Sequence, residues 1–94
     1  MIRSMKAFNL KIQGKVQWVG FRASTQQVAQ ALGVEGWVRN TPDGSVEIHV
    51  QGEDEKVEQL LEWCYNGPPG ADVKRVDVLK TNPDETIMRF SILF

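Results

Sequence analysis

The sequence predicts an α+β sandwich, because two kinds of hydrophobic pattern alternate along it. Several short stretches have a hydrophobic residue at every second position, as half-buried strands do, and two others have them at helical spacing. Glycine and proline separate the stretches. Their order is strand, helix, strand, strand, helix, strand, with one more strand at the end, which is the split βαβ arrangement. We therefore predict a ferredoxin-like βαββαβ fold with an extra C-terminal strand and two helices on one face of a mostly antiparallel sheet.

A strand, a loop and a helix open the pattern. Hydrophobic residues alternate with polar ones from Phe8 to Ile12, which predicts a strand. From Phe21 they recur at helical spacing until Gly33, a residue type that often ends helices. The loop at 14–21 joins the strand to the helix.

A β-hairpin follows the first helix. Residues 34–40 predict a strand, and Pro42-Asp43-Gly44 predicts a tight turn. Valine and isoleucine alternate with polar residues from Val46 to Val50, which predicts the returning strand. The polar side chains that we expect to be exposed on the central strands are Asn9, Lys11, Gln13, Glu47, His49 and Gln51.

A second helix and two strands complete the pattern. The helix begins near Asp54, and the hydrophobic residues of its buried face are Val57, Leu60, Leu61 and Cys64. The residues that mark the two final strands are Val76 and Val78, then Met88, Phe90, Ile92 and Phe94. Because no repeat or linker divides the chain, we expect residues 1–94 to form a single domain.

Composition argues against several classes of protein. Eleven basic and twelve acidic side chains give a net charge of −1, which disfavours broad binding to nucleic acid or to anionic membranes. No hydrophobic run approaches the ~20 residues of a membrane span, and no signal peptide is visible. Cys64 is the only cysteine, so no internal disulfide can form and we expect a cytoplasmic protein. We expect Cys64 in the core and the chain to be a monomer.

The loop and helix N-terminus at residues 14–22 have the properties of an anion site. The first backbone N–H groups of a helix lack partners within the helix, and the helix dipole adds partial positive charge there. Arg22 adds a guanidinium that stays charged at physiological pH. The first and second strands run parallel in this fold, so their C-terminal ends share one edge of the sheet. Arg22 and Asn40 can therefore converge on one small anion.

Two motifs lie in this region. The first is Gly14-Lys15-Val16-Gln17-Trp18-Val19-Gly20-Phe21-Arg22, and the second is Gly36-Trp37-Val38-Arg39-Asn40, followed by a turn at Asp43-Gly44. In order and spacing they resemble the two signature motifs of the acylphosphatase family, of which the first is Gly-x-Val-Gln-Gly-Val-x-Phe-Arg. One position departs, because Trp18 stands where the family pattern has glycine.

The resemblance implies hydrolysis of acyl phosphates, the mixed anhydrides of carboxylic and phosphoric acid. It implies that Arg22 and loop amides hold the phosphoryl group, that Asn40 orients the attacking water and that the substrate phosphate takes the proton. The residues that supply these amides are Lys15, Val16, Gln17, Trp18, Val19, Gly20 and Phe21. The implied partners are a small acyl phosphate and inorganic phosphate, without nucleic acid, membrane, metal or cofactor.

The residue types in the region suit this reaction. An asparagine does not accept a proton near neutral pH, but it can orient a water molecule by hydrogen bonding. The leaving group is a carboxylate whose conjugate acid has a pKa of about 4. No strong general acid is therefore needed.

Trp18 leaves an alternative open. A bulky residue in the left-handed backbone conformation carries strain of ~1 to 3 kcal/mol. The loop can keep its shape with the indole in solvent, be rebuilt around an intact pocket, or be distorted and inactive. The alternative is a noncatalytic ferredoxin-like module that binds an anion or metabolite. An RNA-recognition module is not favoured, because the expected exposed positions of the central strands form no aromatic platform.

Overall fold

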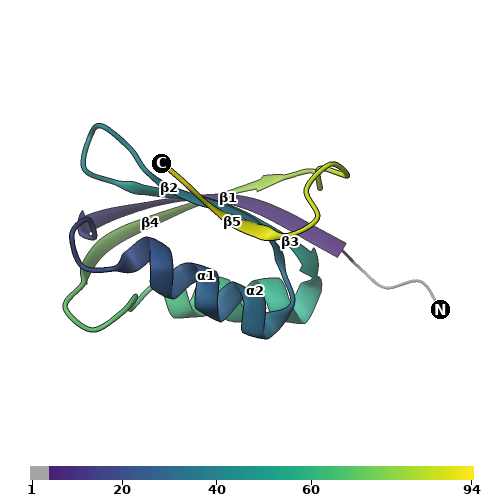
Figure 1. Ribbon diagram of the computed structural model, residues 1–94, viewed down its shortest axis with the longest axis horizontal. Coiled ribbons are helices and arrows are strands. Elements are labelled where there is room, and N and C mark those ends of the chain that lie inside the picture. The colour runs from purple at the N-terminus through teal and green to yellow at the C-terminus, as the bar shows by residue number, and fades with distance from the viewer. Residues whose placement is uncertain (1–4) are drawn as a thin grey trace.

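The computed structural model describes residues 5–94 and has the predicted ferredoxin-like fold. Its elements are β1 (Met5–Lys15), α1 (Phe21–Leu32), β2 (Glu35–Asn40), β3 (Val46–Glu53), α2 (Asp54–Cys64), β4 (Asp72–Thr81) and β5 (Phe90–Leu93). The strands form one sheet in the order β4-β1-β3-β2-β5. Both helices lie side by side on one face of it (Figure 1). Within the described residues, neither helix is long and apolar enough to cross a membrane.

The sheet topology gathers several chain segments at one end of the molecule. β3 lies between β1 and β2 and is antiparallel to both, so β1 and β2 run in the same direction, as predicted. β5 is parallel to β2, so its C-terminal end lies at the same edge. Figure 1 shows the loop before α1 and the turn between β2 and β3 at this end as well. Segments distant in sequence can therefore contribute to one site there.

The core lies between the sheet and the helices. Its largest fully buried side chains include Leu10, Ile12, Ile48, Leu60, Val50 and Val57. Phe21, the first residue of α1, packs edge-on against Trp63 of α2, with the ring centroids 5.5 Å apart. α1 ends at Gly33, as predicted, and the φ of 76° at that residue explains the choice of glycine.

The open face of the sheet differs from the prediction at two positions. His49 and Gln51 are expected to be exposed, but only 6% and 3% of their surfaces are accessible. The connection between β4 and β5 covers them. The Asp84 N–H donates to Gln51 Oε1 over 2.8 Å, and Gln51 Nε2 donates to the Asp84 carbonyl oxygen over 2.8 Å. The alternation of residues along one strand does not reveal such a covering loop.

His49 belongs to the same polar cluster. Its Nε2 lies 2.8 Å from Gln51 Oε1 and its Nδ1 lies 2.8 Å from Asn9 Oδ1. Its ring stacks on Trp37, with the centroids 6.1 Å apart. Because Gln51 Oε1 already accepts the N–H of Asp84, it is an acceptor here, and His49 Nε2 is the donor to it. These contacts give His49 a structural role.

The last strand begins later than predicted. Met88, expected in the strand, precedes β5 and is 81% exposed. The backbone before it forms a turn, in which the Ile87 N–H donates to the Asp84 carbonyl oxygen over 3.1 Å. The chain becomes extended again only at Phe90.

Burial should keep Cys64 unreactive in the folded protein. Cys64 is fully buried at the end of α2, and burial raises the pKa of its thiol to about 12. The reactive thiolate is therefore scarce at mildly alkaline pH. We expect no reaction of the native protein with an aromatic disulfide reagent, and complete reaction in guanidinium chloride. Rapid labelling of the native protein would contradict the buried position.

Candidate active site

A cavity of about 290 Å³ lies at the end of the sheet where β1, β2 and β5 end. Its lining residues are Val16, Trp18, Gly20, Phe21, Arg22, Ala23, Asn40, Ile92 and Phe94. Arg22 comes from the first turn of α1, and Asn40 is the last residue of β2. The structure thus brings together the two side chains that the sequence predicts to converge.

The loop between β1 and α1 contributes one side of this cavity. Of the loop residues expected at the site, those that line the cavity are Val16, Trp18, Gly20 and Phe21. The others, Lys15, Gln17 and Val19, are not among the lining residues. Lys15 is the exposed last residue of β1. The predicted loop is therefore at the site, but its residues contribute unequally.

The N-terminus of α1 opens on the cavity. Gly20, with a φ of 75°, precedes the helix, and the Ser24 N–H donates to its carbonyl oxygen over 3.0 Å. Within residues 5–94, no side chain caps this end, and the first turn carries no acidic residue. No side chain of these residues therefore satisfies the first N–H groups of the helix, and no acidic residue of the first turn offsets the positive end of its dipole.

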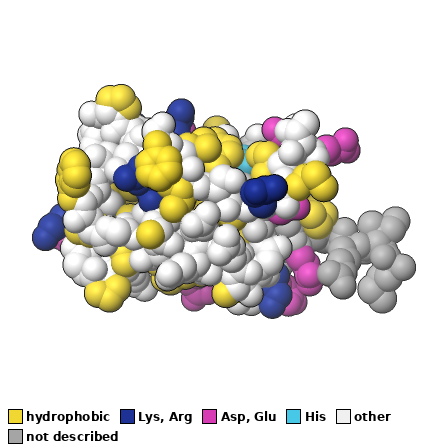
Figure 2. Space-filling view, viewed as in Figure 1, with side chains coloured by type: hydrophobic (Ala, Val, Ile, Leu, Met, Phe, Trp, Pro, Cys, Tyr) yellow, Lys and Arg dark blue, Asp and Glu magenta, His cyan; other side chains and the backbone are white. Residues whose placement is uncertain are grey.

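Arg22 is a cationic group at this cavity. Among the described residues, no carboxylate forms an ion pair with it. Its guanidinium lies over the ring of Phe94, with Cζ 5.1 Å from the ring centroid. A cation–π contact with a neutral ring does not cancel the charge of the guanidinium. Figure 2 shows hydrophobic and basic side chains side by side at the C-terminal end of β5.

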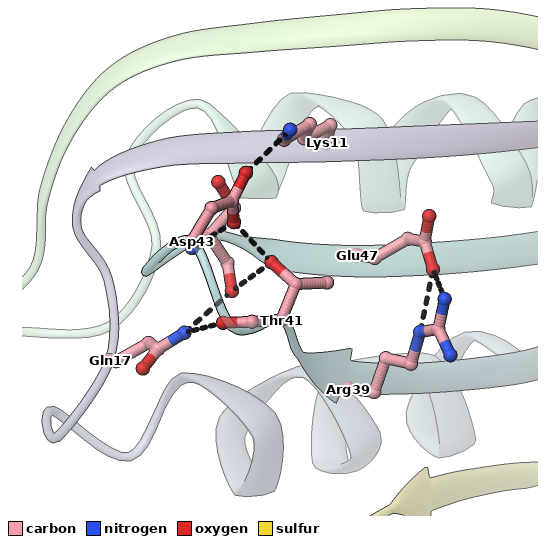
Figure 3. A network of polar contacts seen from close by, with 7 residues as sticks. Lys11, Gln17, Arg39, Thr41, Asp43 and Glu47 are labelled. Atoms are coloured by element: carbon pink, nitrogen blue, oxygen red, sulfur yellow. Dashed lines mark hydrogen bonds and ion pairs between the residues drawn. The ribbon is translucent and has the colours of Figure 1, made fainter.

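The side chain of Gln17 fastens the loop to the turn between β2 and β3. Gln17 Nε2 donates to the carbonyl oxygens of Thr41 and Ser45, over 2.8 and 2.9 Å (Figure 3). Thr41 directly follows Asn40, so these two bonds fix the position of the loop relative to Asn40. The sequence prediction considers only the backbone amide of Gln17 and misses this contact. The sequence feature that could have indicated this contact is the glutamine inside the loop motif.

Asp43 stabilises the same turn. Its carboxylate forms an ion pair with Lys11 Nζ of β1 over 2.7 Å. It also accepts hydrogen bonds from the Ser45 N–H, over 3.1 Å, and from the Thr41 hydroxyl (Figure 3). The hydrogen bond from Lys11 is the main reason that the pKa of Asp43 is well below its ordinary value.

Arg39 pairs with Glu47 over 2.6 Å and is not among the residues that line the cavity.

Trp18 has a left-handed backbone conformation, with a φ of 66°. Of the residues that the structure describes, it is the one residue other than glycine with a positive φ. Its side chain is 98% exposed. The indole therefore projects into solvent, as in the first of the three expected outcomes.

The groups at the cavity suit a small oxyanion. In the described part of the chain, no group of three or more His, Cys, Asp or Glu side chains is placed to hold a metal ion. The cavity instead presents a guanidinium, a carboxamide and the N-terminus of a helix. The first and third attract negative charge, and the second can hold a water molecule.

Comparison with known proteins agrees with this chemistry. The family model for acylphosphatases matches residues 8–92. The chain belongs to the acylphosphatase family. It is 56% identical over 77 residues to an acylphosphatase from Thiobacillus denitrificans, covering 82% of this chain and 86% of that protein. It is 51% identical over 76 residues to an acylphosphatase from Thermococcus kodakarensis, covering 81% and 84%.

The fold comparison leads to the same family. The crystal structure of an acylphosphatase from Bacillus subtilis superposes with a TM-score of 0.90 and 33% sequence identity, covering 97% of this chain and 100% of that one. As an acylphosphatase, the protein is an enzyme that hydrolyses acyl phosphates to a carboxylate and inorganic phosphate. The noncatalytic module is therefore not favoured.

Replacing Trp18 with glycine should stabilise this acylphosphatase. A left-handed conformation costs a residue with a Cβ ~1 to 2 kcal/mol, and the exposed indole has few contacts to lose. Glycine costs ~0.5 to 1 kcal/mol through the entropy of the unfolded chain. We expect Trp18→Gly to raise the free energy of unfolding by up to ~1.5 kcal/mol, measured by urea denaturation. Trp18→Ala, which keeps the strain, should bring no such gain. A less stable glycine variant would disprove the strain.

Acid should remove the contribution of Asp43 to stability. A carboxyl whose pKa is lowered by folding stabilises the protein above its unfolded-state pKa and ceases to do so as the pH falls through the folded-state value. We expect Asp43→Asn to be less stable than the wild type at neutral pH, with a difference that shrinks below about pH 4. Urea denaturation across a pH series measures it. Asp72→Asn, in an exposed pair with Lys74, serves as the control, and a pH-independent difference for Asp43→Asn would contradict the assignment.

Proposed function

We propose that Arg22 and the amides of residues 15–21 bind the phosphoryl group, and that Asn40 orients the water that attacks it. One observation carries the proposal. Three groups lie at one cavity: a guanidinium that pairs with no carboxylate of residues 5–94, the N-terminus of α1, which no side chain in that range caps, and the side chain of Asn40. The guanidinium is a planar set of donors that matches phosphate oxygens, while the amide oxygen of Asn40 can accept a hydrogen bond from water.

The reaction balances without a base or an acid from the protein. Water attacks phosphorus, the bond between phosphorus and the carboxylate oxygen breaks, and the carboxylate leaves with the bonding electrons. The proton of the attacking water passes to a phosphoryl oxygen. Phosphoryl transfer depends chiefly on positioning and on stabilising the charge of the equatorial oxygens. Arg22 and the helix N-terminus supply that stabilisation.

Two contacts support the positioning role of Asn40. Gln17 ties the loop to the backbone that follows Asn40, and Lys11 and Asp43 hold the turn together. Asn40 is half-buried at the end of β2. These contacts hold the backbone next to Asn40 in place, and a well-positioned backbone favours a well-positioned side chain.

We also propose that residues 1–94 form one domain and that the enzyme acts as a monomer in the cytoplasm. One copy of the chain supplies both Arg22 and Asn40 to the cavity, which is compatible with a monomeric enzyme. The only cysteine is a buried free thiol, as is usual in reducing compartments.

Substitution of Arg22 and Asn40 should separate binding from turnover. We expect Arg22→Ala to lose phosphate binding and hydrolysis together, because removing one partner of a desolvated charged contact costs ~2 to 5 kcal/mol. We expect Asn40→Ala to bind phosphate almost normally while kcat falls by roughly 10² to 10³, as for one lost transition-state hydrogen bond. Benzoyl phosphate hydrolysis and calorimetric titration of inorganic phosphate provide the measurements.

Matched controls lie outside the cavity. Arg39→Ala, on the same strand as Asn40 but paired with Glu47, and Asn66→Ala, exposed after α2, should leave both readouts unchanged. If Asn40→Ala weakened phosphate binding as severely as Arg22→Ala, the water-orienting role would be wrong. If Arg22→Ala bound phosphate normally, the anion would bind elsewhere.

A further inference from the structure

The cavity has an apolar side that phosphate binding does not use. Besides Arg22 and Asn40, its lining consists of glycine and of hydrophobic residues from the loop, α1, β5 and the residue that follows β5. Ile92 and Phe94, both from the C-terminal end of the chain, were not among the predicted site residues. Phe94 is fully exposed and lies against the guanidinium of Arg22. A hydrophobic surface is therefore continuous with the phosphate site.

The shape of the substrate directs its acyl group to this surface. In an acyl phosphate, one bridging oxygen separates phosphorus from the carbonyl carbon, so the acyl group lies within a few ångströms of the phosphoryl group. When Arg22 and the start of α1 hold the phosphoryl group, the acyl group has to lie against the remaining lining or leave through the mouth. Trp18 and Phe94 are the large exposed side chains of that lining.

Contact with an acyl group would bury the exposed indole of Trp18. Its indole is 98% exposed, and its backbone holds a conformation that is unfavourable for any residue with a Cβ. In the free protein, packing of the Trp18 side chain therefore does little to offset the strain of its backbone. An aromatic side chain can bury a large area at a small cost in side-chain entropy. A ligand bound at the cavity is the partner that can supply this packing.

We propose that Trp18 is a specificity-determining residue, whose indole packs against the acyl group together with Ile92 and Phe94. The enzyme then prefers acyl phosphates with aromatic or bulky apolar acyl groups over acetyl phosphate. The proposal rests on the phosphate-binding role of Arg22 proposed above. The bond that breaks joins phosphorus to the carboxylate oxygen, so the apolar part of the acyl group does not change during the reaction. Trp18 therefore contacts it equally in the ground state and the transition state. It therefore acts mainly through KM.

The test compares kcat/KM for benzoyl phosphate and acetyl phosphate in a series of variants at position 18. The different reactivities of the two leaving groups are the same for every variant, so they cancel when the benzoyl-to-acetyl ratios are compared. Trp18→Ala and Trp18→Phe both keep a Cβ in the left-handed conformation and differ in the ring. We expect Trp18→Ala to lower the ratio about fivefold to tenfold through a higher KM for benzoyl phosphate, and Trp18→Phe to keep most of the ratio.

A binding measurement provides a readout that does not depend on turnover. Phenylphosphonate should change the tryptophan fluorescence of the wild type and compete more strongly than methylphosphonate, and Trp18→Ala should lose both effects. Leu79→Ala removes an exposed hydrophobic residue from β4, at the opposite edge of the sheet from β5, and should change neither readout.

Two results would overturn the inference. An unchanged benzoyl-to-acetyl ratio in Trp18→Ala, or equal binding of phenylphosphonate and methylphosphonate to the wild type, would show that the indole does not contact the acyl group. In either case inorganic phosphate would still bind through Arg22, so the proposed function would stand. If Trp18→Ala folds poorly, Trp18→Gly relieves the strain while also lacking the ring, and it should show the same fall in the ratio.

Discussion

β3 pairs with β1 on one side and with β2 on the other, and the location of the active site follows from that double pairing. Because both ladders are antiparallel, the outer two strands of the three run in one direction and end together. α1 starts after a short loop at the end of β1, so its N-terminus and the end of β2 lie at the same cavity. A different position for β3 in the sheet would separate Arg22 from Asn40.

Much of this arrangement could be predicted because it depends on local patterns. Alternation, helical spacing and the glycine at position 33 place the main elements, and the order of the elements fixes the direction of the strands. The convergence of Arg22 and Asn40 follows from that direction alone. The burial of Cys64 follows in the same way from its spacing along α2. Each of these inferences needs only neighbours in sequence and a topology shared by many proteins.

The features that were missed depend on where irregular segments run. His49 and Gln51 are buried because the connection after β4 crosses the open face and pairs with Gln51. Ile92 and Phe94 reach the cavity because β5 lies beside β2 at the edge of the sheet. The two hydrogen bonds from Gln17 Nε2 require two carbonyl oxygens of a distant turn to point at one side-chain amide. Periodicity along the chain contains no information about these tertiary contacts.

The pairing between Gln51 and Asp84 links the cavity to the opposite end of the molecule. The connection from β4 to β5 runs from one edge of the sheet to the other, and Gln51 of the central strand anchors it on the way. A ligand makes its contact with Ile92 only while β5 is docked beside β2. That contact therefore contributes to the apparent affinity in proportion to the docked fraction. Heat or a substitution that loosens the anchor therefore weakens binding without altering any atom that touches the ligand.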